Sequence, residues 1–214
     1  MCIDQLRFNM DSLKYTDASL AMDYGLNLDD ILFKYGVRIN PDFIEDYQQS
    51  NPIPITVGSL GNQPDIRLLP WAYYPFSIST SKQPIVNNLD AVAFNFVNSI
   101  DTVANPEIKK TILLASSNRS RRVPSPVRIS LANLKFKPQA DMFKEKNIPM
   151  AVLLEGKFQS VFANRVDANF IKVYTDSLKK PYATANERDN KIILVKKIVF
   201  LVSIYQGIRK MQQF

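Results

Sequence analysis

The sequence predicts an α/β domain with a mixed, mostly parallel sheet and antiparallel additions. Three continuous apolar runs, at residues 109–117, 148–156 and 191–195, predict its central strands, because uninterrupted apolar runs are typical of strands covered on both faces. Longer connections separate these runs, and alternating segments lie between them. This combination favours an α/β architecture.

The first quarter of the chain predicts two short helices joined by an extended segment. Residues 26–36 have an asparagine cap, two aspartates in the first turn and a terminal glycine, as a short helix does. Residues 37–39 are extended. Residues 40–49 start like a second helix, with Asn40 as the cap and Pro41 at the first position.

The second quarter predicts strands around an irregular stretch. Residues 53–59 alternate and are rich in branched side chains, which predicts a strand. Residues 60–76 combine prolines with aromatic side chains and are too irregular for a helix or a central strand. Within residues 83–101, the alternation at residues 92–96 predicts a half-buried strand.

The second half adds loops and shorter elements to the central strands. A basic loop, residues 118–126, precedes an extended segment at residues 127–131. Residues 158–165 continue as a strand or a short helix. Residues 174–190 form a polar loop before the last central strand, residues 191–195.

The composition excludes several classes of enzyme. The chain has no histidine, so Ser-His-Asp and Cys-His nucleophile systems and histidine-ligated zinc cannot be built. The string nearest to a phosphate-binding loop, residues 155–158, lacks the upstream glycine and the Ser or Thr that would hold magnesium. Cys2 is the only cysteine, so no internal disulfide can form. We expect no cofactor and no metal site.

The positive charge belongs to the end of the chain. The net charge is +7, but residues 191–214 carry five basic side chains and no acid, which leaves 22 basic and 20 acidic side chains before them. We therefore expect no nucleic-acid partner, with a basic-tail DNA binder as the weakest alternative. No signal peptide is visible, and the longest apolar candidate for a membrane span, Ile198 to Tyr205, has eight residues where ~20 are needed.

An aromatic stretch supplies the first candidate site. Arg67, Trp71, Tyr73 and Tyr74 are of the residue types that dominate protein–protein hot spots, and aromatic rings also suit sugars. The alternative is that these rings cap the core under a loop held by prolines.

Two further candidates follow predicted central strands, where α/β sheets bind ligands. Ser116, Ser117, Asn118 and Arg119 could hold a carboxylate, a phosphate or a sugar, or they could form a solvated basic loop.

Glu155 and Lys157 could perform acid–base chemistry or form an ordinary salt bridge. A carboxylate-dependent hydrolase would need Glu155 and a second acid, such as Asp4, within ~5–10 Å.

An ordered set of motifs resembles the gliding-motility-associated GldG proteins of Bacteroidetes, from about Asp4 to Asn190. The motifs are "DDILFKYGVRINPDFIEDYQ", "PIPITVGSLGNQPDIRLLPWAYYP", "QPIVNNLDAVAFNFVNSID", "IKKTILLASS" and "IPMAVLLEGKFQSVFANR". The resemblance implies an extracytoplasmic domain of the class I amidotransferase-like (flavodoxin-like) type, at the periplasmic face of the inner membrane. It also implies permease and ATPase subunits of an ABC transporter, or other proteins of a membrane complex, as partners.

The chain departs from the family pattern at both ends. It begins inside what resembles a strand of the family domain, and the acidic turn Ser-Asp-Gly-Asp that follows the last family strand is replaced by Lys196, Lys197 and Ile198. We expect a truncated domain at residues 1–195 and an atypical tail at residues 196–214 that arises from a frameshift or another open-frame accident. The expected function is non-enzymatic contact with partner subunits or a carbohydrate-like ligand, with the carboxylate-dependent hydrolase as the alternative.

Overall fold

The computed structural model describes residues 1–136, 138–196 and 198–201, the last of these as backbone only. The helices are α1 (Asp29–Lys34), α2 (Ala168–Leu178) and the short 3₁₀ helices η1 (Met10–Lys14), η2 (Leu131–Lys135) and η3 (Ala140–Met142). The strands are β1 (Leu6–Arg7), β2 (Ser19–Asp23), β3 (Val37–Ile39), β4 (Asp42–Asp46), β5 (Ser50–Leu60), β6 (Gln63–Ser77), β7 (Val92–Phe94), β8 (Ile100–Thr102), β9 (Ile108–Ala115), β10 (Ser120–Pro124), β11 (Val127–Ile129), β12 (Pro149–Gly156), β13 (Asn190–Val195) and β14 (Ile198–Leu201).

The prediction of a mostly parallel, flavodoxin-like α/β fold is wrong, because the protein is mostly β. Every pairing between strands of the described chain is antiparallel. The three predicted central strands do form one sheet, in the order β13-β12-β9. Apolar clusters cover both faces of β12: Leu153 packs into one and Val152 into the other. Burial on both faces explains the continuous apolar runs, but it does not set the direction of the strands.

The predicted helix at residues 40–49 is also wrong, because β4 occupies this stretch. All five residues of β4 are buried, with Phe43 and Ile44 directed into different apolar clusters. Asn40 caps no helix; its side-chain amide donates to Ser99 Oγ (2.9 Å) and Asp101 Oδ2 (2.7 Å).

Two segments predicted as irregular or as loops are strands. Residues 60–76 form most of β6, and its prolines are tolerated because β6 pairs only with β5 until it reaches β7 at Phe76 and Ser77. The basic loop contains β10, which pairs with β4. Arg121 of β10 forms an ion pair with Glu45 of β4, so part of the basic run faces acids on the neighbouring strand.

Other predictions agree with the structure in position. Helix α1 lies within the predicted residues 26–36 and ends just before a glycine in the left-handed conformation, Gly36 (φ +82°). Its N-cap is Leu28, without a side-chain cap hydrogen bond, so the predicted asparagine cap is wrong. Strands β5, β7, β11, β12 and β13 lie where strands or extended segments were expected. Two predictions in this part of the chain are wrong. The first residues of the predicted polar loop, 174–178, belong to α2. In place of the strand or short helix predicted at residues 158–165, residues 161–165 form turns and Gln159 makes an isolated bridge with Ala185.

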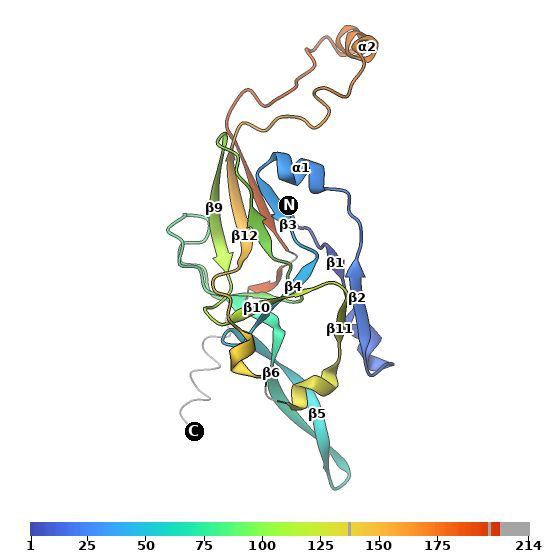
Figure 1. The fold of residues 1–214 in the computed structure, drawn as a ribbon, viewed down its shortest axis with the longest axis vertical. Helices are drawn as coiled ribbons and strands as arrows, with labels where there is room; N and C mark the ends of the chain where they lie inside the picture. Colours follow the sequence, from blue (N-terminus) through green and yellow to red (C-terminus); the bar gives the residue numbers. More distant parts are fainter. Residues whose placement is uncertain (137, 197, 202–214) are drawn as a thin grey trace.

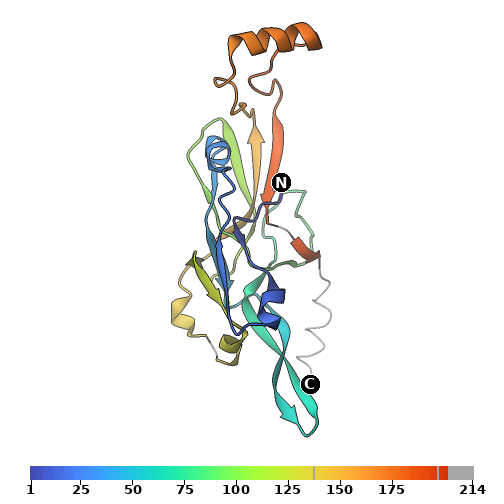
Figure 2. The ribbon, with the colours of Figure 1, turned by 90° about the vertical axis from the view of Figure 1, so that its right-hand side faces the viewer.

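The molecule is elongated and carries one projection at each end of its long axis (Figure 1). The hairpin of β5 and β6 extends from one end. The excursion between β12 and β13, which contains α2, extends from the other, and the perpendicular view shows the same arrangement (Figure 2). The sheet of β9, β12 and β13 lies between the two projections.

The predicted tail falls largely on residue 197 and residues 202–214, which lie outside the described residues. Strand β14 is described, and its backbone pairs with β7. Lys196, just before it, has a buried side chain whose Nζ lies 3.8 Å from a carboxylate oxygen of Asp4.

Candidate functional site

The aromatic candidates lie at the base of the hairpin, where β6 enters the body. Trp71 is only 4% exposed, and its ring centroid lies 4.9 Å from that of Tyr74 and 5.3 Å from that of Phe96. Burial raises the pKa of Tyr74 to about 12. Burial raises the pKa of Tyr73 still further, and the neighbouring Glu45 adds to this shift. These rings therefore have packing partners within the protein.

A groove of about 690 Å³ runs beside these rings, between β6 and the segment that carries η2 and η3. Trp71 and Tyr73 contribute to its wall, together with the cationic side chains of Arg121, Arg128 and Lys135. Its volume lies in the range of small-molecule sites.

The second candidate segment, residues 116–119, divides into a buried half and a surface half. The backbone N–H and Oγ of Ser117 both donate to the Asp46 carboxylate at 2.7 Å. Ser116 Oγ accepts from the backbone N–H of Ile148 at 2.9 Å. Asn118 and Arg119 instead line a surface hollow of about 680 Å³. The two serines thus have structural partners, whereas the next two residues face a hollow.

The proposed carboxylate pair is not brought together. Glu155 lies 2.8 Å from Lys191 and 3.9 Å from Lys109, and the hydrogen bond from Lys191 lowers the pKa of its carboxyl. Asp4 lies instead beside Lys196. Lys191 and Lys196 are five residues apart along an extended chain, a separation of about 16 Å. Lys157 is exposed.

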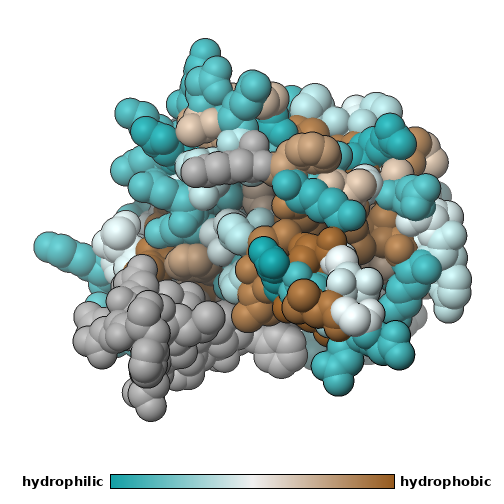
Figure 3. Space-filling model, turned by 90° about the horizontal axis from the view of Figure 1, so that it is seen from below, coloured by the Kyte–Doolittle hydropathy of each residue, from teal (hydrophilic) through white to brown (hydrophobic). Residues whose placement is uncertain are grey.

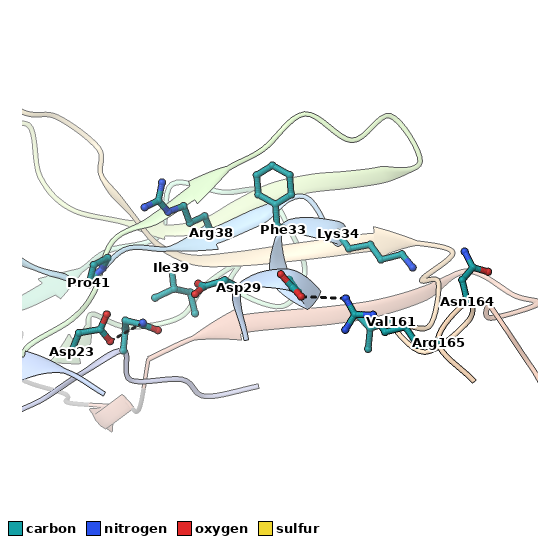
Figure 4. Close-up of a pocket in the computed structure, with 12 residues that line it drawn as sticks. Asp23, Asp29, Phe33, Lys34, Arg38, Ile39, Pro41, Val161, Asn164 and Arg165 are labelled. Atoms are coloured by element: carbon teal, nitrogen blue, oxygen red, sulfur yellow. Dashed lines mark hydrogen bonds and ion pairs between the residues drawn. The ribbon is translucent and has the colours of Figure 1, made fainter. Parts of the chain in front are cut away.

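A cleft of about 880 Å³, lined by charges of both signs, lies beside α1 (Figure 4). Asp30 pairs with Arg165 at 3.2 Å, and Lys34 Nζ donates to the carbonyl of Ser160 at 2.9 Å. These contacts tie the start of the α2 excursion to α1. At the other end of the cleft, Gln5 Nε2 donates to Asp23 at 2.9 Å (Figure 4). Charged groups of this cleft therefore hold parts of the chain together.

The hairpin presents the most distinctive exposed surface. In its register, Pro52 lies opposite Pro70, Pro54 opposite Leu68, and Thr56 opposite Ile66. Residues directly opposite each other share one face of the sheet, so these six side chains form one face, called here the hairpin face. All six are exposed, and none is charged.

The opposite side of the hairpin differs. Ile53 is partly buried and packs against the aromatic cluster, while Arg67, the fourth aromatic-stretch candidate, pairs with Asp65 at 3.0 Å. Seen from the hairpin end, apolar side chains gather on the surface of the molecule (Figure 3). The alternation of residues 52–56 was visible in the sequence, but which face would stay uncovered was not.

The comparisons with known proteins supply the broader context. The family described as ABC-type uncharacterized transport system matches residues 1–213, nearly the whole chain. The chain belongs to this family. No curated protein and no solved structure gives a match. Among the described residues of this ABC-transport family member, no helix is long and apolar enough to span a bilayer.

Proposed function

We propose that the chain is a non-enzymatic interaction domain of its ABC-type transport system, and that it binds a permease or ATPase subunit through the hairpin face. This proposal rests on the exposure of the hairpin face: Ile66 is 60% exposed and Leu68 is 56% exposed, with prolines around them. A continuous uncharged surface of this kind is typical of a protein–protein contact.

The build of the hairpin supports contact through side chains. Its outer part is two-stranded, and such a hairpin is only marginally stable in water unless something packs against it. Pro52 and Pro54 lie on β5, the edge strand of its sheet in the described chain. They have no N–H to offer to a further strand, which disfavours contact by strand addition. A partner would therefore cover the face of the hairpin rather than extend its edge.

The charge environment of Glu155 supports a non-enzymatic role. Lys191 and Lys109 both neutralise this carboxylate, and the absence of histidine from the sequence removes the commonest general base. The finer assignment to gliding-motility proteins at the periplasmic face is part of the proposal, and it is supported by the ordered motifs that resemble GldG.

The test is co-purification with the permease and ATPase subunits of the same transport system, produced together with the chain. The double variant Ile66→Lys/Leu68→Asp places two charges on the hairpin face. We expect the affinity for the subunits to fall more than about tenfold, because charges left in an apolar interface are costly. The variant should keep its unfolding free energy within about 1 kcal/mol, since both side chains are exposed.

A matched control exists on β2. Leu20 and Met22 are 52% and 59% exposed and lie two residues apart on a strand. Leu20→Asp/Met22→Lys makes the same chemical change away from the hairpin and should leave binding intact. Equal binding by both double variants would refute the role of the hairpin face, and no binding by the parent chain would refute the partner class.

A further inference from the structure

The α2 excursion carries an amphipathic helix whose apolar side is largely exposed. Projected at 100° per residue, Phe170, Ile171, Val173, Tyr174 and Leu178 of α2 fall on one side, and Ser177 lies among them. Phe170, Val173 and Leu178 are each more than half exposed, and no residue of α2 is buried.

This exposure is energetically unusual. A helix of eleven residues is marginal in water on its own, and such helices are normally stabilised by packing of the apolar side. Helix α2 instead stands at the far end of the molecule (Figures 1 and 2). It does not pack extensively against another element of the described chain. Its apolar side is therefore suited to a surface outside this chain.

Aromatic rings form a row on this side of the excursion. Phe170 and Tyr174 stack with centroids 6.3 Å apart, and the ring of Tyr182 meets Tyr174 edge-on at 5.7 Å. Rings with an apolar body and a hydroxyl tip are enriched where a bilayer meets water.

The charges on and beside α2 indicate which kind of surface its apolar side contacts. Between residues 168 and 180, three lysines (Lys172, Lys179 and Lys180) accompany one acid, Asp176. Asp167 lies at the other end, at the N-cap, so the positive charge gathers at the C-terminal end of the helix. Aromatic and leucine side chains on one side, with Lys172 on the other side and Lys179 and Lys180 just past the last turn, suit a helix that lies in the interface of an anionic membrane.

We propose that α2 docks the chain on an anionic lipid bilayer, with its apolar side in the interface and its lysines among the headgroups. An ABC-type transport system operates in a membrane, so such a surface lies within reach of the domain. The contacts of Arg165 with Asp30 and of Lys34 with Ser160 fix the start of the excursion to α1. The docked helix would thereby orient the whole domain.

The test uses the full chain and two kinds of vesicle: phosphatidylcholine alone, and an equal mixture of phosphatidylcholine and phosphatidylglycerol. We expect cosedimentation with the anionic vesicles and little with the neutral ones. Phe170→Trp should report insertion by a blue shift of its emission on anionic vesicles. Phe136→Trp, at a residue that is 74% exposed elsewhere, should show no shift.

Charge reversal separates lipid docking from apolar adhesion. Lys179→Glu/Lys180→Glu should weaken binding to anionic vesicles about tenfold or more. The control Lys144→Glu/Lys146→Glu, at two exposed lysines, should bind as the parent does. The hairpin variant Ile66→Lys/Leu68→Asp should also keep vesicle binding, so this proposal and the proposed function can fail separately.

Three outcomes would overturn the proposal. The first is equal binding to neutral and anionic vesicles, and the second is an unchanged emission of Phe170→Trp. The third is the absence of vesicle binding by the parent chain. If Phe170→Ser/Leu178→Ser then abolishes binding to a transport subunit, α2 docks in a protein groove instead.

Discussion

Lys196 is a basic side chain held in an apolar setting. It is 8% exposed, and its Nζ lies 5.2 Å from the centroid of the Phe43 ring and 3.8 Å from the Asp4 carboxylate. Burial lowers its pKa to about 8 from the ordinary 10.5, although Asp4 acts in the opposite direction. A lysine placed in this way lowers the stability of the folded protein near neutral pH.

Lys196→Met should therefore raise the free energy of unfolding at pH 7 by roughly 1–3 kcal/mol, because the variant no longer buries a charge. Below pH 8 the lysine is protonated in both states, so the advantage of the variant is constant. Between pH 8 and 10.5 the lysine is protonated mainly in the unfolded state. The unfolding free energy of the parent therefore rises relative to that of the variant, by at most ~1.4 kcal/mol per pH unit. Above pH 10.5 the advantage is gone.

Denaturant unfolding of both proteins across this pH range measures the effect. An advantage of the variant that stays constant from pH 7 to pH 10.5 would show that Lys196 does not titrate as its burial implies.

Site residues were predictable from the sequence only as residue types. Ser117 was selected as a ligand-binding candidate because it follows an apolar strand, but its hydroxyl already donates to Asp46. Asp46 is fully buried and also accepts from the backbone N–H groups of Gln48 and Gln49. In the sequence this acid resembles a surface charge in a helix. Its partner lies 71 residues away, a distance at which sequence patterns give no pairing.

At the level of elements, the hydrophobic pattern predicted the positions of the central strands in the sequence, but not whether neighbouring strands are parallel or antiparallel. Strands β9, β12 and β13 were located because burial on two faces leaves an uninterrupted apolar signature. The same signature arises in parallel and antiparallel sheets. Strand β4 was taken for a helix because Asn40 and Pro41 match a helix start, yet tertiary pairing with β10 overrides that local preference.

The two projections depart from the sequence prediction for a related reason. Residues 60–76 contain prolines that a central strand would exclude, but β6 tolerates them because it pairs only with β5 over most of its length. Helix α2 has an amphipathic sequence, but its second half falls within the polar loop predicted at residues 174–190. Ile66 and Leu68 in the outer part of the hairpin and Phe170, Val173 and Leu178 in α2 are exposed, so the usual link between apolar pattern and core fails for them.

Gly156, at the end of β12, marks the point where the α2 excursion leaves the sheet. Its φ is +151°, and an added Cβ would lie 2.5 Å from the carbonyl oxygen of Glu107. Gly156→Ala should therefore cost about 1–3 kcal/mol of unfolding free energy, from backbone strain and the collision with a strand neighbour.

Gly58→Ala is the matched control for this prediction. Gly58 lies in the hairpin, its φ is not in the left-handed region, and nothing lies within 4 Å of the added Cβ. This change should be neutral or slightly stabilising. Thermal unfolding of the two variants gives the comparison, and equal midpoints would contradict the close approach at Gly156.

At the scale of the whole molecule, the two projections should be separable. The backbone N–H of Ser160 donates to the carbonyl of Thr184 at 2.8 Å, so the two legs of the excursion lie side by side there. Residues 161–183 can thus be replaced by Asn-Gly, a favoured two-residue hairpin turn. Phe158, which is buried in the core, is retained.

We expect this shortened chain to keep its unfolding midpoint within a few degrees, because the replaced side chains are largely exposed and the lost Arg165–Asp30 pair lies at the surface. It should lose binding to anionic vesicles and retain binding to the transport subunits. Loss of both activities in a folded chain would show that the two ends do not act independently.

In the proposed arrangement, the position of the central sheet between the two projections gives the domain the role of a spacer. With α2 resting on lipid, the sheet of β9, β12 and β13 sets the height above the bilayer at which the hairpin meets its partner (Figure 1). A strand rises about 3.3 Å per residue, so lengthening all three strands by two residues would lift the hairpin by about 7 Å. The length of these strands thereby sets the distance between the bilayer and the hairpin face. A partner subunit that binds the hairpin face would need its docking surface at that distance from the bilayer.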